Sequence, residues 1–137
     1  MKPKIRVLTL AVADLGTSLA FYRDGLGLPT EGILGTEFED GAVTFFTLDD
    51  NMILALYPRE SLARDANIPA KGMIPADFSI GYTVGSKEQV DATLAEAERA
   101  GARITDPPRD KLWGGYTGYF QYLDGHLWEV VWNPALI

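Results

Sequence analysis

The chain has 137 residues, 47% of them hydrophobic, which is enough to bury one core, either as one domain or as two small modules that share a sheet. The absence of cysteine excludes disulfide bonds, thiolate metal sites and a cysteine nucleophile. A formal net charge of −7 without a run of basic residues argues against nucleic acid and anionic membranes as partners, and no apolar run is long enough to span a bilayer.

The first half of the chain predicts a strand, a helix and three more strands. Ile5–Val12 alternates in side-chain type, as expected for a strand with one crowded and one open face. Asp14 follows as a helix N-cap, and apolar residues recur at helical spacing until Gly25. The next strands are a short, irregular one and then the two arms of a hairpin, at Glu31–Phe38, Ala42–Leu48 and Met52–Tyr57.

The segment between the two halves has the composition of a connection. Residues 60–66 favour a short helix, and the rest of the segment up to Asp77 contains Pro69, Gly72 and Pro75, which are typical of a linker. We therefore expect one domain, residues 1–137, made of two modules. Their predicted bounds are about 4–58 for module 1, about 59–76 for the linker and about 77–134 for module 2.

The second half repeats the order of the first. Phe78–Val84 alternates as a strand, Ser86 and Gln89 form a helix capping box, and Gly101 supplies the C-terminal stop of the helix. A short strand at Arg103–Ile104 then leads through Pro107-Pro108 and a loop from Lys111 to Tyr116 into a closing hairpin. Strand, helix, short strand and hairpin thus occur twice, which indicates an internal duplication and an α+β fold of tandem βαβββ modules.

The closing hairpin carries the carboxylate with the strongest claim to chemistry. Two strands rich in aromatic and β-branched residues, Tyr119–Leu123 and Leu127–Trp132, flank the turn signal Asp124-Gly125. Alternation in the second strand puts Trp128 on the face that suits a packed helix and Glu129 on the opposite face, between apolar neighbours. An ionised carboxylate in that setting needs a partner.

The chain resembles the vicinal oxygen chelate superfamily, which includes glyoxalase I, extradiol dioxygenases, fosfomycin-resistance enzymes and bleomycin-resistance proteins. The resemblance is carried by the repeated βαβββ order and by two signatures, AVADLGTSLAFYRDGLGLP near the start and YLDGHLWEV near the end. It implies two modules whose sheets curl around a shared cup with the helices outside, and commonly a homodimer.

The resemblance also implies where a metal would be bound. The metal-using members place four ligands in the cup, and the matching positions of this chain hold Val7, either Leu54 or Ala55, Ser79 and Glu129. Only Glu129 is a carboxylate, and one carboxylate supplies far fewer ligands than the coordination shell of a divalent ion needs. His126, the sole histidine, has the opposite parity to Glu129 and is expected on the helix side or at the rim. We therefore expect no metal and no other cofactor.

The predicted cup face has small residues on its floor and hydrogen-bonding side chains on its walls. The candidate ligand-binding residues are Tyr57, Ser79, Trp113, Tyr116, Tyr119, Gln121 and Glu129. Such a face suits a planar or amphipathic ligand, with the glycine-containing loop at Trp113–Tyr116 covering the mouth. The alternative is that these aromatic residues belong to an ordinary core or to a dimer interface. Candidate counter-charges for Glu129 are Arg23, Arg59, Arg64 and Arg109.

Three functions remain open at this point. The first is a metal-free protein that binds a small amphipathic or aromatic molecule. The second is an enzyme of the glyoxalase or dioxygenase kind, with Glu129 as the catalytic residue. The third is a structural or regulatory dimer with a closed cup. The amino terminus lacks the hydrophobic region of a signal peptide, so we expect a cytoplasmic homodimer whose partner is a small molecule.

Overall fold

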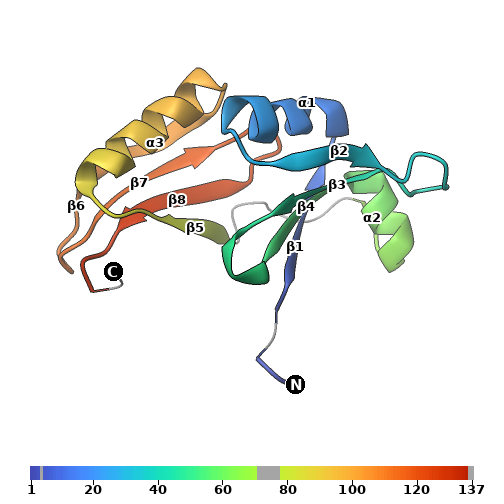
Figure 1. The fold of residues 1–137 in the computed structure, drawn as a ribbon, viewed down its shortest axis with the longest axis horizontal. Helices are drawn as coiled ribbons and strands as arrows, with labels where there is room; N and C mark the ends of the chain where they lie inside the picture. The colour runs from blue at the N-terminus through green and yellow to red at the C-terminus, as the bar shows by residue number, and fades with distance from the viewer. Residues whose placement is uncertain (4, 71–77, 136–137) are drawn as a thin grey trace. The chain divides into compact units, whose positions relative to one another are not determined.

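The computed structural model describes residues 1–3, 5–70 and 78–135. The chain divides into two compact units, residues 1–73 (unit 1) and 74–137 (unit 2). Each unit contains a four-stranded sheet with helices (Figure 1). The predicted α+β class and the tandem βαβββ order are confirmed. Gly72 and Pro75 of the predicted linker lie outside the described residues. None of the helices within the described ranges is long and apolar enough to cross a membrane.

Unit 1 orders its strands β1-β4-β3-β2, with β1 parallel to β4 and the other neighbours antiparallel. The strands are β1 (Val7–Val12), β2 (Thr30–Leu34), β3 (Val43–Thr47) and β4 (Ile53–Pro58). The helices are α1 (Leu15–Leu19), which continues as a π-helical segment η1 (Ala20–Gly25), a 3-10 turn η2 (Asp49–Asn51), and α2 (Arg59–Ala66). Residues 59–66, where the predicted linker begins, therefore form a helix that contacts β1 and β4.

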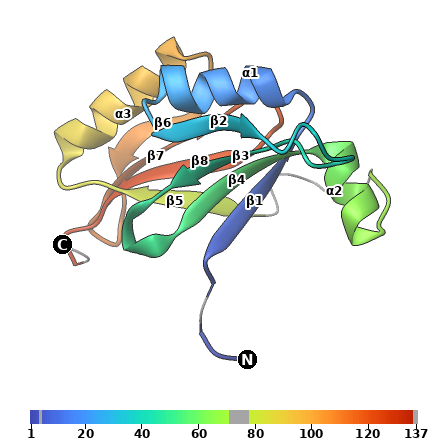
Figure 2. The same ribbon diagram turned by 45° about the vertical axis from the view of Figure 1, so that its right-hand side comes forward.

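The first helix of unit 1 begins where the sequence predicts. The Asp14 carboxylate accepts a hydrogen bond from the Thr17 backbone N–H at 2.7 Å, which satisfies one of the free donors of the first turn. Helix α1 lies against β2, β3 and β4 (Figure 2). The core between them includes Tyr22, Phe46 and Leu56, each at most 1% exposed. The Leu10 side of β1 is buried and its Thr9 side is open, as the alternation predicts.

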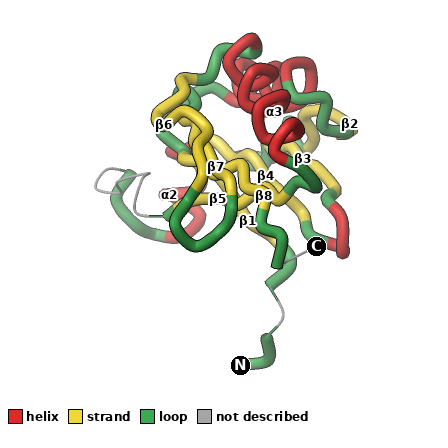
Figure 3. The backbone as a smooth tube through the Cα atoms, turned by 90° about the vertical axis from the view of Figure 1, so that its left-hand side faces the viewer, coloured by secondary structure: helices red, strands yellow, loops and turns green. Residues whose placement is uncertain are grey.

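Unit 2 repeats the arrangement with the order β5-β8-β7-β6. Its elements are β5 (Ser79–Thr83), α3 (Lys87–Arg99), β6 (Arg103–Asp110), β7 (Tyr116–Gln121) and β8 (Leu127–Trp132). Helix α3 packs on β6, β7 and β8, and Figure 3 shows the helix in red and the strands in yellow. The Ser86 hydroxyl accepts from the Gln89 N–H at 3.2 Å, and the Gln89 amide oxygen accepts from the Gly85 N–H at 2.6 Å. The predicted cap is therefore confirmed.

The buried aromatic residues of the unit 2 sheet lie on the face that helix α3 covers. The rings of Phe120 and Trp128 stack with centroids 5.8 Å apart, and both residues are buried under α3 with Val130. Gly118 lies so close to the Leu94 side chain that a Cβ there would stand 2.4 Å from the leucine methyl. The opposite face, which no helix of unit 2 covers, is called the open face below.

Two strands of unit 2 extend beyond their predicted bounds. The pair Pro107-Pro108, expected in a loop, lies inside β6. Because β6 is an edge strand with register irregularities on either side of Asp106, the two prolines remove no hydrogen bond that a central strand would need. Strand β7 begins at Tyr116, so this residue is in a strand and not in the predicted loop.

Candidate functional site

The open face of unit 2 brings Glu129 and the candidate polar residues onto neighbouring strands. In the register, Glu129 of β8 lies opposite Tyr119 of β7 on one side and Gly81 of β5 on the other. Strand β5 contributes only small side chains to this face, and all of them are exposed: Ser79, Gly81 and Thr83. No described atom lies within 4 Å of the position that a Cβ of Gly81 would occupy, so the space beside Glu129 over β5 is open.

Glu129 and Tyr119 form a hydrogen-bonded pair across the two strands. The Tyr119 hydroxyl donates to Glu129 Oε2 at 3.0 Å. Burial, and secondarily this hydrogen bond, raises the pKa of Tyr119 above its usual value, so the hydroxyl remains a donor at neutral pH. Glu129 Oε1 has no hydrogen-bond partner among the described residues. The pair therefore presents one free carboxylate oxygen, held in place from one side.

The partner of Glu129 is a tyrosine and not one of the predicted arginines. Three of those arginines pair with aspartates near them: Arg23 with Asp24, Arg64 with Asp40, and Arg109 with Asp106. Arg59 donates to the Ala11 carbonyl oxygen at 3.2 Å. Among the described residues, the hydroxyl of Tyr119 is thus the group that compensates the Glu129 carboxylate.

A second polar chain lies on the same face, toward the hairpin turn. The Gln121 amide donates to the Gly125 carbonyl oxygen at 2.8 Å, and its own oxygen accepts from Arg103 Nη2 at 2.9 Å. Arg103 lies directly opposite Gln121 in the register of β6 and β7. The guanidinium is therefore held on the open face by an amide that is itself fixed by the backbone, and a cationic group joins the Glu129–Tyr119 pair on that face.

The structure places the other three predicted ligand-binding residues on the helix face of unit 2, in a turn and in unit 1. Tyr116 has the parity of Phe120, lies on the helix face, and donates to Asp91 of α3 at 2.7 Å. Trp113, 56% exposed, lies in the turn between β6 and β7. Tyr57 belongs to unit 1, where its hydroxyl donates to the Asp40 carbonyl oxygen. The sequence predicts Tyr116 in a loop because two glycines precede it, but β7 already begins at this residue.

The residues at the family's metal-ligand positions do not fit a divalent ion. The register pairs Ala55 with Phe45 and Thr9 as it pairs Glu129 with Tyr119 and Gly81, so the second ligand position falls on Ala55 and not on Leu54, which has the opposite parity. Alanine has no donor atom. Among the described residues, no three His, Asp or Glu side chains gather closely enough to hold a metal. His126 is buried, 7% exposed, just before β8.

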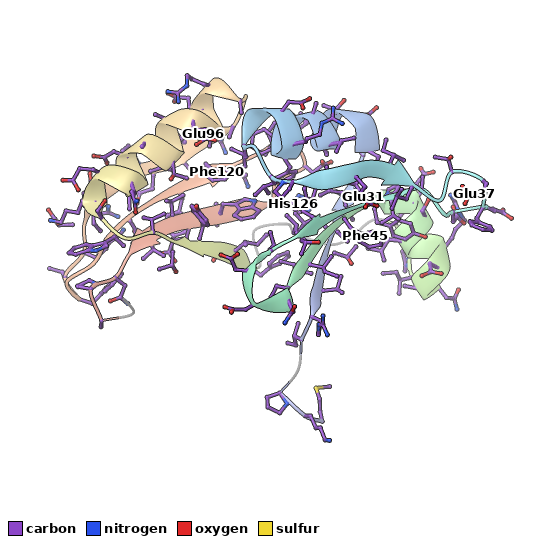
Figure 4. The ribbon with its side chains drawn as sticks, in the orientation of Figure 1. Glu31, Glu37, Phe45, Glu96, Phe120 and His126 are labelled. Atoms are coloured by element: carbon purple, nitrogen blue, oxygen red, sulfur yellow. The ribbon has the colours of Figure 1, made fainter. Side chains whose placement is uncertain are left out.

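Sequence reasoning missed a hollow on the open face of unit 1. It has a volume of about 480 Å³ and is lined by residues of β2 and β3 and of the segment before β2, among them Phe45 and Leu34. A signal was present, because alternation in Val43–Thr47 places Phe45 and Phe46 on opposite faces and only one face is covered by a helix. Figure 4 labels Phe45 on β3 and Glu31 on β2.

Comparison with known proteins identifies the family of the chain. Residues 4–130 match the family model described as the Glyoxalase/Bleomycin resistance protein/Dioxygenase superfamily. An uncharacterised protein of Bacillus subtilis (strain 168), YraH, is 29% identical over 133 residues, 93% of this chain and 96% of the relative. A glyoxalase-related enzyme from Fulvimarina pelagi has a TM-score of 0.83 at 25% identity over 97% of this chain and 90% of that one. Lactoylglutathione lyase from Agrobacterium tumefaciens, 22% identical over 96% and 95% of the two chains with a TM-score of 0.69, shows the same fold.

Proposed function

The chain belongs to the glyoxalase/bleomycin resistance protein/dioxygenase superfamily, and from this premise we propose that it is a metal-independent protein that binds a small amphipathic or aromatic molecule. The open face of unit 2 is the proposed binding face. The observation that carries the proposal is the Glu129–Tyr119 pair, because it holds a charged acceptor with one free oxygen on a partly buried surface. A ligand hydroxyl or amine would donate to Glu129 Oε1, and its apolar part would lie over the small residues of β5.

The surroundings of the pair support recognition of a ligand with both polar and apolar parts. Tyr119 offers the face of its ring as well as its hydroxyl. Gln121 and Arg103 offer hydrogen-bond donors farther along the same face, where a carboxylate or phosphate of the ligand would be attracted. The apolar residues Leu127 and Val131 flank Glu129 on β8. A charge-assisted hydrogen bond in such partly dehydrated surroundings contributes more than the same bond at an exposed position.

The second candidate function is proton transfer with Glu129 as the general base. It is favoured by the free Oε1 atom and by the family, which includes lactoylglutathione lyase. Three of the four metal-ligand positions, Val7, Ala55 and Ser79, lack a charged or imidazole donor, and this argues for binding over catalysis. A positioned base by itself accelerates a reaction about 10²- to 10⁴-fold, which is far less than a base acting together with a Lewis acid.

Ligand screening followed by one conservative substitution tests the binding function. A thermal-shift screen of planar aromatic compounds, antibiotics and glutathione adducts should yield at least one stabilising compound, since a ligand at a hundred times its Kd adds about 2.7 kcal/mol. For that compound, Glu129→Gln should weaken binding about tenfold to a hundredfold in calorimetry, because a hydrogen bond to a charged group is lost. Glu98→Gln, an exposed carboxylate on α3, is the matched control and should leave the Kd unchanged.

Metal analysis separates the two leading functions. Protein purified without chelator should contain far less than one divalent ion per chain. One tightly held ion per chain that the substitution Glu129→Gln removes would contradict metal-independent binding and favour the enzyme. A screen in which no compound stabilises the protein would contradict both the binding protein and the enzyme, and would favour the structural or regulatory dimer.

A further inference from the structure

A second charged cluster lies on the open face of unit 2, beside the Glu129–Tyr119 pair. Asp106 of β6 is the partner of Tyr119 in the register, so Tyr119 lies between Asp106 on one neighbouring strand and Glu129 on the other. Arg109 Nε donates to Asp106 Oδ2 at 3.3 Å, and Lys111 Nζ lies 3.5 Å from the same oxygen. Lys111 follows the last residue of β6 and reaches back to this carboxylate, and its side chain is only 20% exposed.

This cluster carries one surplus positive charge. Arg109 and Lys111 share the single carboxylate of Asp106, and neither has another ion pair among the described residues. The neighbouring Asp110 does not neutralise the surplus, because its carboxylate is paired at 2.6 Å with Lys87 on the helix face. An anionic group is therefore attracted to this end of the open face. The attraction is strongest at Lys111, because water screens its charge less than that of the more exposed Arg109.

Glu129 carries the opposite surplus on the other side of Tyr119. Its carboxylate accepts from a hydroxyl and is paired with no cation in the part of the chain that the structure describes. Neighbouring strands of a sheet are about 4.8 Å apart, so the backbones of Asp106 and Glu129 are separated by roughly 10 Å across β7. The face thus presents an unpaired negative charge and a surplus positive charge at the two ends of a short span, with the Tyr119 ring between them.

We propose that the ligand of this face is dipolar: a small molecule with a protonated amine at one end, a carboxylate at the other, and an apolar body about as long as an aromatic ring between them. The amine would donate to Glu129 Oε1, the body would lie over Tyr119, and the carboxylate would accept from Lys111. This inference rests on the function proposed above and narrows its ligand class. Arg103, an exposed cation at the opposite end of β6, is the competing anchor for the carboxylate.

Four probes built on one ring test the proposal. The compound 4-(aminomethyl)benzoate carries both charges, 4-methylbenzylammonium only the positive one, 4-methylbenzoate only the negative one, and 4-methylbenzyl alcohol neither. Each is titrated into ¹⁵N-labelled full-length protein, and the backbone amides of β6, β7 and β8 are followed by NMR. The dipolar probe should bind about tenfold more tightly than the ammonium, because it adds one hydrogen bond between charged groups, and the alcohol should bind more weakly than either.

One substitution at each end of the span assigns the two charges. Lys111→Gln should lower the affinity for the dipolar probe about tenfold, to that of the ammonium, and should leave the affinity for the ammonium itself unchanged. The ammonium is therefore an internal measure of whether the site of this variant is intact. Lys2→Gln removes the same charge from an exposed residue of unit 1 and should preserve the preference for the dipolar probe. Glu129→Gln should weaken binding of the dipolar probe and of the ammonium by about tenfold or more.

The possible results separate this inference from the proposed function. Equal affinities of the dipolar probe and the ammonium in the wild-type protein, both lowered by Glu129→Gln, would overturn the dipolar class and leave the binding role of Glu129 standing. A preference that survives Lys111→Gln and is lost in Arg103→Gln would overturn the assignment of the anchor to Lys111. Unchanged affinities in Glu129→Gln would contradict both proposals. No shift with any probe would overturn the inference alone, because the thermal-shift screen judges the proposed function with other compounds.

Discussion

The two units place equivalent backbone positions in the same register but fill them differently on their two faces. On the helix faces one matching position holds the same residue type, Phe46 in unit 1 and Phe120 in unit 2, and both are almost fully buried. On the open faces they differ, since Ala55 of unit 1 stands where unit 2 has Glu129, and Phe45 stands where unit 2 has Tyr119. One open face is an apolar hollow with a single carboxylate at its side, and the other carries a hydrogen-bonded polar pair.

The difference shows which requirement acts on each face. A helix face needs apolar volume that fits a neighbouring helix, and this need is the same in both units. An open face has no such partner, so its side chains are free to serve a ligand. The strand order and the register decide where an acidic residue or an aromatic ring will stand, and the residue types decide what that position can bind.

The largest loss of stability should come from substitutions on the helix faces. Phe46→Ala and Phe120→Ala, at 0% and 2% exposure, should each lower the free energy of unfolding by about 3–5 kcal/mol, because each leaves a cavity under a helix. Urea denaturation followed by circular dichroism measures both. A cost below about 1 kcal/mol for either variant would show that the equivalence of register does not extend to packing. Phe45→Ala, on the open face of unit 1, is the control and should cost much less.

Much of this fold follows from local patterns in the sequence. The caps at Asp14 and Ser86 and the alternation around Trp128 and Glu129 predict helix starts and faces correctly, because both are set by neighbours within four residues. The length of β6 does not follow in the same way. Its two prolines are tolerated only because the strand lies at a sheet edge, and the edge position depends on the pairing of the whole unit.

In the candidate site, too, the face of a side chain follows from local sequence, whereas its partner depends on how the strands pair. Alternation puts Tyr119, Gln121 and Glu129 on one face, but only the register of β7 against β8 makes Tyr119 the partner of Glu129. Tyr116 was expected at the mouth of a cup and lies under α3, because the start of β7 could not be read from a glycine-rich stretch. The hollow of unit 1 needs the bulge at Gly32, which no residue pattern indicates. The binding roles of these residues stay predictions.

A transplant of the polar pair into unit 1 should have the second largest effect. Ala55→Glu places a carboxylate at a position that is 2% exposed and opposite Phe45, which lacks the hydroxyl that Tyr119 supplies at the equivalent position of unit 2. It should destabilise the protein by about 3 kcal/mol, the cost of an unpaired buried charge. Phe45→Tyr alone should change stability by less than about 0.5 kcal/mol, because Phe45 is 43% exposed.

The double variant Ala55→Glu/Phe45→Tyr then measures the coupling. If the matching register recreates the pair of unit 2, the new tyrosine should recover about 1.5 kcal/mol of the loss, the contribution of a hydrogen bond to a charged group. The four proteins of the double-mutant cycle are compared by urea denaturation at neutral pH. Additive losses would mean that equivalent backbone positions do not by themselves bring the two side chains together.

The smallest expected effect is on the pH dependence of stability, and it is confined to alkaline pH. It concerns Tyr119, whose counterpart in unit 1, Phe45, has no titratable group. Burial and the hydrogen bond to Glu129 raise the pKa of Tyr119, so the folded chain holds this proton more tightly than the unfolded chain does. The stability from this group is therefore complete below about pH 10, the ordinary tyrosine pKa, and is lost as the pH rises through the folded value. Tyr119→Phe should make the free energy of unfolding fall less steeply above pH 10, and Glu129→Gln should have a smaller effect in the same direction because burial, the main cause, remains. The slope of stability between pH 9 and pH 11 measures both, and an unchanged slope in Tyr119→Phe would mean that folding does not raise the pKa of this hydroxyl.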